Sequence, residues 1–246
     1  MTRQTLIPFM PQLCYLTFEV SYLGGHSMNT EFINMKPAIC FAFLASASAL
    51  DAHPHVFIDG GVDVYLDEDG MLHKVEVTWL YDKFETLYIL STQGILPAKD
   101  GTLNSNDLLV LTSLYENWPP DFDGSVHLKY LGQNIGLNWP QNAAVTYSEN
   151  RLKVKFEREL KTKFVLTDTP LEIGFYERTY FFDFSITSQP LIFGDAGSCS
   201  ASVIPFEINS QSADILRELS YLSREETPED TQIGAKLADR IQLICD

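Results

Sequence analysis

Two histidines and an aspartate lie close together in the run Ala52-His-Pro-His-Val-Phe-Ile-Asp59. Because Pro54 favours an extended backbone, His53 and His55 are expected to project to the same side, about 6–7 Å apart along a strand. Two imidazoles at this spacing can share a borderline divalent cation such as Zn²⁺, Ni²⁺ or Cu²⁺. Asp59 lies about 13 Å from His55 along a straight strand, so it is expected to join the site only if the segment bends.

A β-hairpin is expected to follow the histidines. The strand His55–Asp67 alternates apolar and polar residues, and a second strand of the same kind comes after it. Between them, Asp69-Gly70 is typical of a two-residue hairpin turn with positive φ at both positions. Pairing Glu68 with Met71 across this turn brings the apolar faces of the two strands together, so the register is self-consistent.

This register supplies a third ligand. It places Asp82 opposite Phe57 and diagonal to His55, about 7–8 Å away between α-carbons. A metal site formed by His53, His55 and Asp82 is therefore predicted, with Asp59 as a weaker ligand and zinc as the expected ion. Nickel, cobalt and copper are the alternatives. A second interpretation is an exposed histidine tip that binds no specific metal.

A different cation site is suggested by the loop 96–107. With Gly101 at the sixth position of an EF-hand loop, four ligand positions carry side-chain oxygens: Asp100, Thr102, Asn104 and Asp107. Leu96 and Ala98 occupy the first and third positions and offer no side-chain oxygen. We therefore expect the helix–loop–helix shape to persist without tight calcium binding.

An export signal precedes the histidines. Lys36 leads the apolar run Pro37–Leu44, and small Ala and Ser residues follow it, which is the order of a secretory signal peptide. Residues 1–52 are expected to be removed, leaving 53–246 as one periplasmic domain. Cleavage after Ala49 and after Ala52 both remain open. The translation start is open among three methionines: Met1, Met28 and Met35.

Removal of this segment leaves two cysteines, Cys199 and Cys245. An even pair in an exported chain predicts a disulfide, with two free thiols as the alternative.

The net charge of the chain disfavours one class of binding partner. The chain has 17 Lys and Arg against 33 Asp and Glu, a net charge of −16, which argues against a nucleic-acid partner because such a surface repels phosphates.

The remaining pattern predicts an α+β fold rich in β-strands. Helices are expected over 83–93 and 105–118, forming an insert at about 83–118, and a short helix over 213–223. Strands of antiparallel sheets are expected over 125–131, 135–139, 144–147, 151–157, 171–176, 180–187 and 240–245. The sequence contains no Gly-x-Ser-x-Gly, Walker, Cys-x-x-Cys or His-Glu-x-x-His motif, so we predict that the protein is not an enzyme.

The sequence resembles the ZevA-like family of periplasmic ABC-type transport components of unknown function, which includes a zinc-uptake accessory protein. The resemblance is carried by the signal peptide followed by the segment 52–59, the Asp69-Gly70 turn, the end of the second strand, Tyr176–Tyr180, Cys199 and the tail from Ile233 to Cys245. It implies a role in divalent-metal uptake with an inner-membrane permease as partner.

Three functions follow from these patterns. The leading one is a periplasmic divalent-metal-binding accessory protein that supports zinc, nickel or cobalt uptake by an inner-membrane transporter. A copper oxidase with a histidine brace is the second. It requires His53 as the free N-terminus and a distant histidine, for which His127 is the candidate. The third is a metal-free structural partner of a membrane transport complex.

Overall fold

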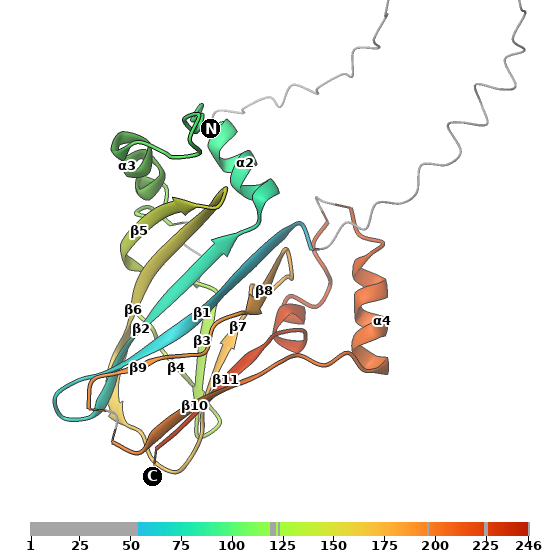
Figure 1. Cartoon of the computed structure of the whole chain (residues 1–246). Helices are drawn as coiled ribbons and strands as arrows, with labels where there is room; N and C mark the ends of the chain where they lie inside the picture. The colour runs from blue at the N-terminus through green and yellow to red at the C-terminus, as the bar shows by residue number, and fades with distance from the viewer. Residues whose placement is uncertain (1–53, 119–121, 123, 196, 224–225, 246) are drawn as a thin grey trace, which may run out of the picture. The chain divides into compact units, whose positions relative to one another are not determined.

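Two β-sheets form the framework of the described chain (Figure 1). The computed structural model describes residues 54–118, 122, 124–195, 197–223 and 226–245. The predicted signal peptide, its cleavage points and His53 lie outside the described residues. The described residues all belong to one compact unit. Among the described residues, no helix is long and apolar enough to span a bilayer.

The larger sheet has the order β5-β6-β2-β1-β8, with a short β9 beside β1. Its strands are β1 (Val56–Leu66), β2 (Met71–Tyr81), β5 (Gln141–Ser148), β6 (Arg151–Val165), β8 (Phe182–Ile186) and β9 (Ile192–Phe193). The prediction of purely antiparallel sheets is wrong here, because β8 and β9 both pair with β1 in parallel. Parallel pairing joins segments that are distant in the chain, so no local turn signal announces it.

The smaller sheet has the order β10-β11-β7-β3-β4. Its strands are β3 (Val126–Tyr130), β4 (Gln133–Ile135), β7 (Leu171–Phe175), β10 (Cys199–Ile204) and β11 (Arg240–Cys245). The helices are α2 (Lys83–Thr92), α3 (Ser105–Ser113), α4 (Ser210–Leu219) and the 3₁₀ turn η1 (Ile233–Lys236). The predicted helix–loop–helix insert and C-terminal helix are therefore present, although α3 is shorter than expected and α4 begins and ends earlier in the chain than expected. Strands β9 and β10 were not predicted.

The register of the β1–β2 hairpin matches the prediction over most of its length. Val64 pairs with Val75, and Val62 pairs with Val77. The turn itself differs, because Gly70 has a φ of 72° whereas Asp69 is not among the residues with positive φ. Asp67 pairs with Met71 instead of Glu68, since its N–H donates to the Met71 carbonyl at 2.9 Å.

A bulge reconciles this longer turn with the predicted pairing. Tyr65 pairs with Lys74 but Leu66 pairs with Leu72, so His73 is the extra residue on β2. The Asp67 carboxylate holds the turn by accepting hydrogen bonds from two backbone N–H groups, of Asp69 and Met71. The register beyond the bulge is the predicted one, and a slip of one residue would turn the apolar face of one strand to the solvent.

One apolar core contains buried side chains from both sheets, including Val77 of β2, Phe156 of β6, Ile173 of β7 and Leu243 of β11. Trp79 lies within an aromatic cluster, with ring centroids 5.2 Å from Phe156 and 5.5 Å from Phe184. The core is thus formed by strands from the whole length of the described chain.

Asp239 links the edge of the larger sheet to the smaller one. Its carboxylate accepts hydrogen bonds from the backbone N–H groups of Ile186 and Phe206, both at 2.8 Å. Its own carbonyl accepts from the N–H of Phe175, the last residue of β7. Three chain segments therefore depend on this one residue for their backbone hydrogen bonds.

Candidate functional site

The candidate site lies where β1 begins and β2 ends. The backbone N–H of His55 donates to the carbonyl of Phe181 at 3.0 Å, and the two rings lie 4.8 Å apart between centroids. His55 is half-buried by this contact. Its imidazole is therefore held against the segment that leads into β8, rather than lying on an isolated chain end.

Asp82 lies opposite Phe57, as the register predicts. The Asp82 N–H donates to the Phe57 carbonyl at 3.2 Å, and the Phe57 N–H donates back to the Asp82 carboxylate at 3.4 Å. The other carboxylate oxygen accepts from the Glu85 N–H at 2.8 Å and caps the N-terminus of α2. Asp82 therefore has a structural role that the sequence analysis did not consider. Each carboxylate oxygen keeps a second lone pair that a cation could use.

Asp59 forms an ion pair that the sequence analysis also missed. Its carboxylate lies 2.7 Å from the Arg151 guanidinium. The same guanidinium donates to the carbonyls of Tyr81 and Leu80, at 2.6 and 2.8 Å, and so crosses the end of β2. A cation bound by Asp59 would have to compete with this arginine.

Asp183 is an acidic residue of this region that the sequence analysis did not select. In the parallel pairing of β1 and β8 it lies opposite Phe57, on the side away from Asp82. Burial raises the pKa of the Asp183 carboxyl, and the charge of Asp239 adds to this, while a hydrogen bond from Tyr180 acts in the opposite direction. Desolvation also raises the pKa of the Tyr180 hydroxyl. No short-range pattern could have found Asp183, because the pairing that brings it here is parallel and non-local.

Within the described parts of the chain, no group of three or more His, Cys, Asp or Glu side chains is placed to hold a metal ion. Asp82 lies opposite Phe57, two residues after His55, and Asp59 pairs with Arg151. Because His53 lies outside the described residues, the site of His53, His55 and Asp82 stays a prediction.

His127, the candidate second histidine of a copper brace, lies in the other sheet. Its ring stacks on Tyr176, with centroids 4.0 Å apart and an interplanar angle of 16°. Its Nε2 lies 3.2 Å from the Tyr176 carbonyl oxygen. Both contacts hold the imidazole within β3 and the end of β7.

A profile of a family described as "Protein of unknown function (DUF1007)" matches residues 38–245. The chain belongs to the DUF1007 family. The match includes His53, His55, Asp82 and both cysteines of the predicted disulfide. A search of curated proteins finds no match to the chain.

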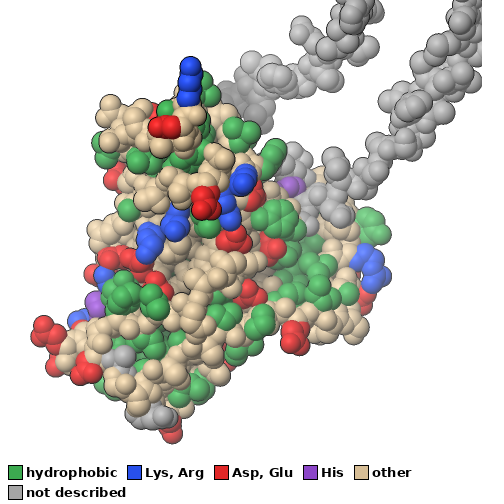
Figure 2. Space-filling model, in the orientation of Figure 1, with side chains coloured by type: hydrophobic (Ala, Val, Ile, Leu, Met, Phe, Trp, Pro, Cys, Tyr) green, Lys and Arg blue, Asp and Glu red, His purple; other side chains and the backbone are tan. Residues whose placement is uncertain are grey.

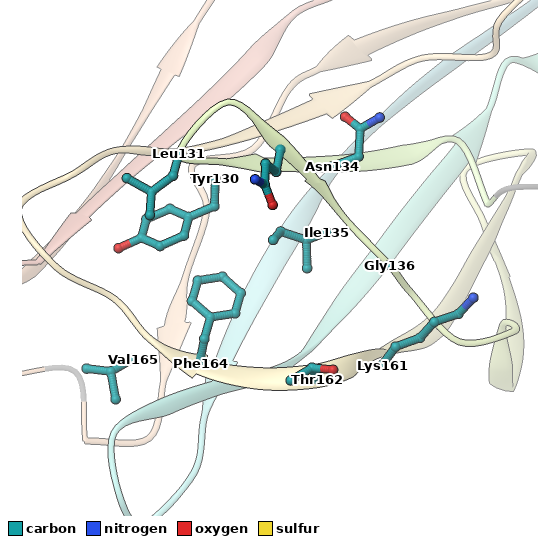
Figure 3. A pocket seen from close by; sticks show the side chains of 10 residues that line it. Tyr130, Leu131, Asn134, Ile135, Gly136, Lys161, Thr162, Phe164 and Val165 are labelled. Carbon is teal, nitrogen blue, oxygen red and sulfur yellow. The ribbon is translucent and has the colours of Figure 1, made fainter.

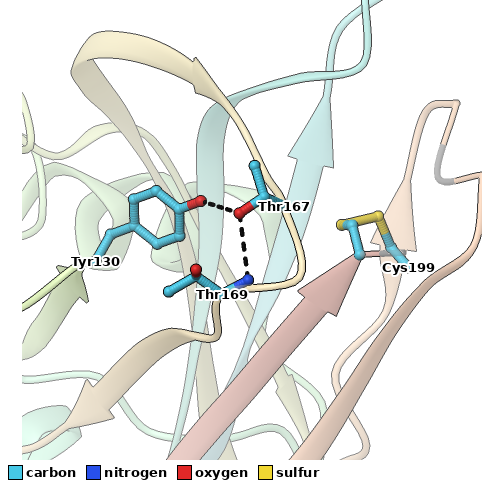
Figure 4. The surroundings of a disulfide bond; sticks show 5 residues. Tyr130, Thr167, Thr169 and Cys199 are labelled. Atoms are coloured by element: carbon cyan, nitrogen blue, oxygen red, sulfur yellow. Dashed lines mark hydrogen bonds between the residues drawn. A yellow bond between two sulfur atoms is a disulfide. The ribbon is translucent and has the colours of Figure 1, made fainter.

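The predicted disulfide is present in this DUF1007 protein. Cys199 and Cys245 lie directly opposite each other on β10 and β11, with α-carbons 3.9 Å apart. The Thr167 segment borders it (Figure 4). The Thr167 carbonyl accepts a hydrogen bond from the Cys245 N–H, and the Thr167 hydroxyl oxygen lies 2.8 Å from the Tyr130 hydroxyl oxygen. The cross-link thus closes the end of the smaller sheet.

The loop between α2 and α3 is organised by local hydrogen bonds. The Asp100 carboxylate accepts from the N–H and hydroxyl of Thr102, at 3.1 and 2.7 Å. Asn104 caps α3 by accepting from the Asp107 N–H, and its amide donates to the Asp107 carboxylate. All four of the proposed EF-hand positions therefore carry capping or turn contacts, and the likeness of this loop to an EF-hand is not confirmed.

A cavity of about 450 Å³ lies between the β3–β4 hairpin and the end of β6 (Figure 3). Tyr130 and Phe164 stack within it, with ring centroids 4.8 Å apart, and Ile135 and Val165 add further apolar surface. Lys161 lies along Gly136, whose missing side chain leaves room for the lysine stem. None of the predicted site residues lines this cavity.

Proposed function

We propose that this DUF1007 protein is a non-enzymatic, divalent-metal-binding accessory protein of the periplasm that supports zinc uptake by an inner-membrane transporter, with nickel or cobalt as alternative cargo. The observation that carries the proposal is the pairing of Phe57 with Asp82. It keeps the Asp82 carboxylate against the backbone of β1, two residues from His55 and therefore about 6–7 Å along the strand.

The ligands of the proposed site are His53, His55 and Asp82. Neutral imidazole and carboxylate are both common zinc ligands, and zinc prefers four-coordinate geometry. Three protein ligands leave one position for water or for a group of the transport partner. Such an incomplete shell suits transfer of the ion, because an incoming ligand can bind before the outgoing ones are released.

The charge of the chain supports the same function. A net charge of −16 raises the local concentration of divalent cations around the protein and favours their encounter with the site. The resemblance to ZevA-like transport components supports zinc as cargo and a membrane permease as the partner that receives it.

Calorimetric zinc titration of the protein purified from the periplasm tests the proposal. We expect one site, and the double substitution His53→Ala and His55→Ala should abolish it. His73→Ala is the matched control, since His73 lies in the bulge near the hairpin turn, and it should bind zinc as wild type does. Wild-type zinc affinity in the double variant would contradict the proposal.

The N-terminus of the purified protein separates this function from the oxidase. A chain that begins at His53 and retains copper in elemental analysis would favour a histidine brace. In a chain that begins at Leu50, the backbone nitrogen of His53 would belong to a peptide bond and could not serve as the free amine that such a brace requires.

A further inference from the structure

Apolar side chains are unusually exposed on α2 and on the loop that follows it. Phe84 is 78% exposed and Leu96 is 86% exposed, and Leu87 and Tyr88 are also exposed. We call these four residues the α2 apolar surface. Isolated exposed apolar side chains are common, but a concentration of large ones marks a surface that meets another apolar phase.

The orientation of α2 about its own axis turns this surface toward the solvent. Thr86 and Leu90 are buried, and the Thr86 hydroxyl accepts a hydrogen bond from the Leu152 N–H of β6 at 3.0 Å. Phe84, Leu87 and Tyr88 follow the i, i+3, i+4 spacing of one helix face, and this face points away from β6. The exposure is thus a consequence of how the helix is attached.

The surface lacks acidic side chains, although the chain as a whole is strongly acidic. Residues 86–98 carry no charged side chain. Glu85, the acidic residue of α2, lies near Tyr115, whose pKa its charge raises in addition to the larger effect of burial. Hydrophobic side chains are visible over the α2–α3 end of the molecule (Figure 2), where α3 exposes Leu109 and Val110.

Two exposed lysines lie near the ends of the uncharged stretch. Lys83 precedes it on the far side of half-buried Glu85, and Lys99 follows it directly, next to exposed Asp100. Ammonium groups beside exposed aromatic and aliphatic residues match the phosphates and the acyl boundary of a lipid surface. A second copy of this chain is less well matched, since two molecules of net charge −16 repel each other.

The path of the chain also supports a lipid surface as the partner. The first described residue, Pro54, lies just before β1, and Phe57 of β1 is hydrogen-bonded to Asp82, the N-cap of α2. The apolar run Pro37–Leu44 ends ten residues before Pro54, a length of chain that spans at most about 35 Å. The predicted signal peptide would insert that run in a membrane during export, and α2 would then stay within this distance of the bilayer.

We propose that the α2 apolar surface docks the protein on the surface of a phospholipid bilayer, with Phe84, Leu87, Tyr88 and Leu96 at the acyl boundary and Lys83 and Lys99 at the phosphates. Metal binding plays no part in this inference, so either proposal can fail without the other.

Flotation with phosphatidylcholine vesicles tests the docking, using processed protein from the periplasm. Wild type should float with the vesicles, and the double substitution Phe84→Ser and Leu87→Ser should lower the partition coefficient about tenfold or more. The matched control, Ile208→Ser with Tyr221→Ser, removes two equally exposed apolar side chains outside the surface and should leave partitioning unchanged. Lys83→Glu with Lys99→Glu should reduce binding to vesicles that contain phosphatidylglycerol by about tenfold.

Three results would overturn the proposal. The first is wild-type protein that stays with the soluble fraction, and the second is equal flotation of wild type and the Phe84→Ser, Leu87→Ser variant. The third is a dimer in sedimentation velocity that this variant dissociates, which would identify the surface as a contact between two copies. Thermal unfolding followed by circular dichroism checks that the variants are folded. We expect them to unfold as wild type does, because the substituted side chains are exposed.

Discussion

The Asp82 carboxylate accepts a hydrogen bond from the backbone N–H of Phe57, 25 residues earlier in the chain, and also caps the helix that follows it. One side chain therefore joins the start of β1, the end of β2 and the start of α2. The proposed metal ligand and the helix cap are the same residue, so substitutions at this position must separate the two roles.

Substitution of Asp82 by Ala removes the cap, whereas Asn retains it. Asp82→Ala should lower the free energy of unfolding by about 1 kcal/mol, the usual effect of losing an N-cap side chain. Asp82→Asn should stay close to wild type in urea denaturation but weaken zinc binding, since an amide oxygen carries no charge. Equal zinc affinity of Asp82→Asn and wild type would show that Asp82 is a cap and not a ligand.

Zinc binding should weaken as the pH falls. The ligands are neutral imidazoles, so protons compete with the metal as the pH falls through the histidine pKa, near 6.5 in unperturbed side chains. Competition titrations with a chromogenic chelator between pH 7.5 and 5.5 measure this. An affinity that does not change over that range would contradict histidine ligation.

Asp183→Asn should stabilise the protein at neutral pH. Burial raises the pKa of Asp183 in the folded state, so the native state binds this proton more tightly than the unfolded chain does. The protonated carboxyl therefore contributes fully to the free energy of unfolding below the pKa that Asp183 has in the unfolded chain. This contribution is lost as the pH rises through the higher pKa that Asp183 has in the folded protein. Denaturation of both proteins across pH 3–8 should therefore show a gain for Asn at pH 7 that vanishes at low pH.

Loss of the Cys199–Cys245 bond should destabilise the protein markedly. The bond spans 46 residues, and closing a loop of this length contributes about 4 kcal/mol in the chain-entropy model. Cys199→Ala with Cys245→Ala should show a loss of that order in urea denaturation, and reduction of wild type should reproduce it. A variant as stable as the oxidised protein would contradict the prediction.

Asp239→Ala should also lower the free energy of unfolding. The backbone N–H groups of Ile186 and Phe206 would both lose their acceptor, and each unsatisfied donor costs about 1–3 kcal/mol when shielded from water. We expect a loss of about 2–4 kcal/mol in the free energy of unfolding. Asp168→Ala, at an exposed aspartate, is the control and should change stability little.

The hairpin was predictable because its information is local. Alternation of apolar residues on both strands disfavours a slip of one residue, and the nearby turn limits larger slips. The resulting register also placed Asp82 opposite Phe57. The turn was predicted less well. An Asp-Gly pair is compatible with a two-residue turn and with a longer one, and the bulge at His73 absorbs the difference.

The sequence by itself determined the β1–β2 register, the approximate positions of α2, α3 and α4, and the pairing of Cys199 with Cys245. Each depends on the pattern of neighbouring residues or on the count of a scarce residue type. Only the tertiary structure decided that β8 lies parallel to β1, that Arg151 pairs with Asp59, and that Asp183 and Asp239 lie close enough to interact. These contacts join segments far apart in the chain, and their geometry is set by the packing of the two sheets, which no local periodicity encodes.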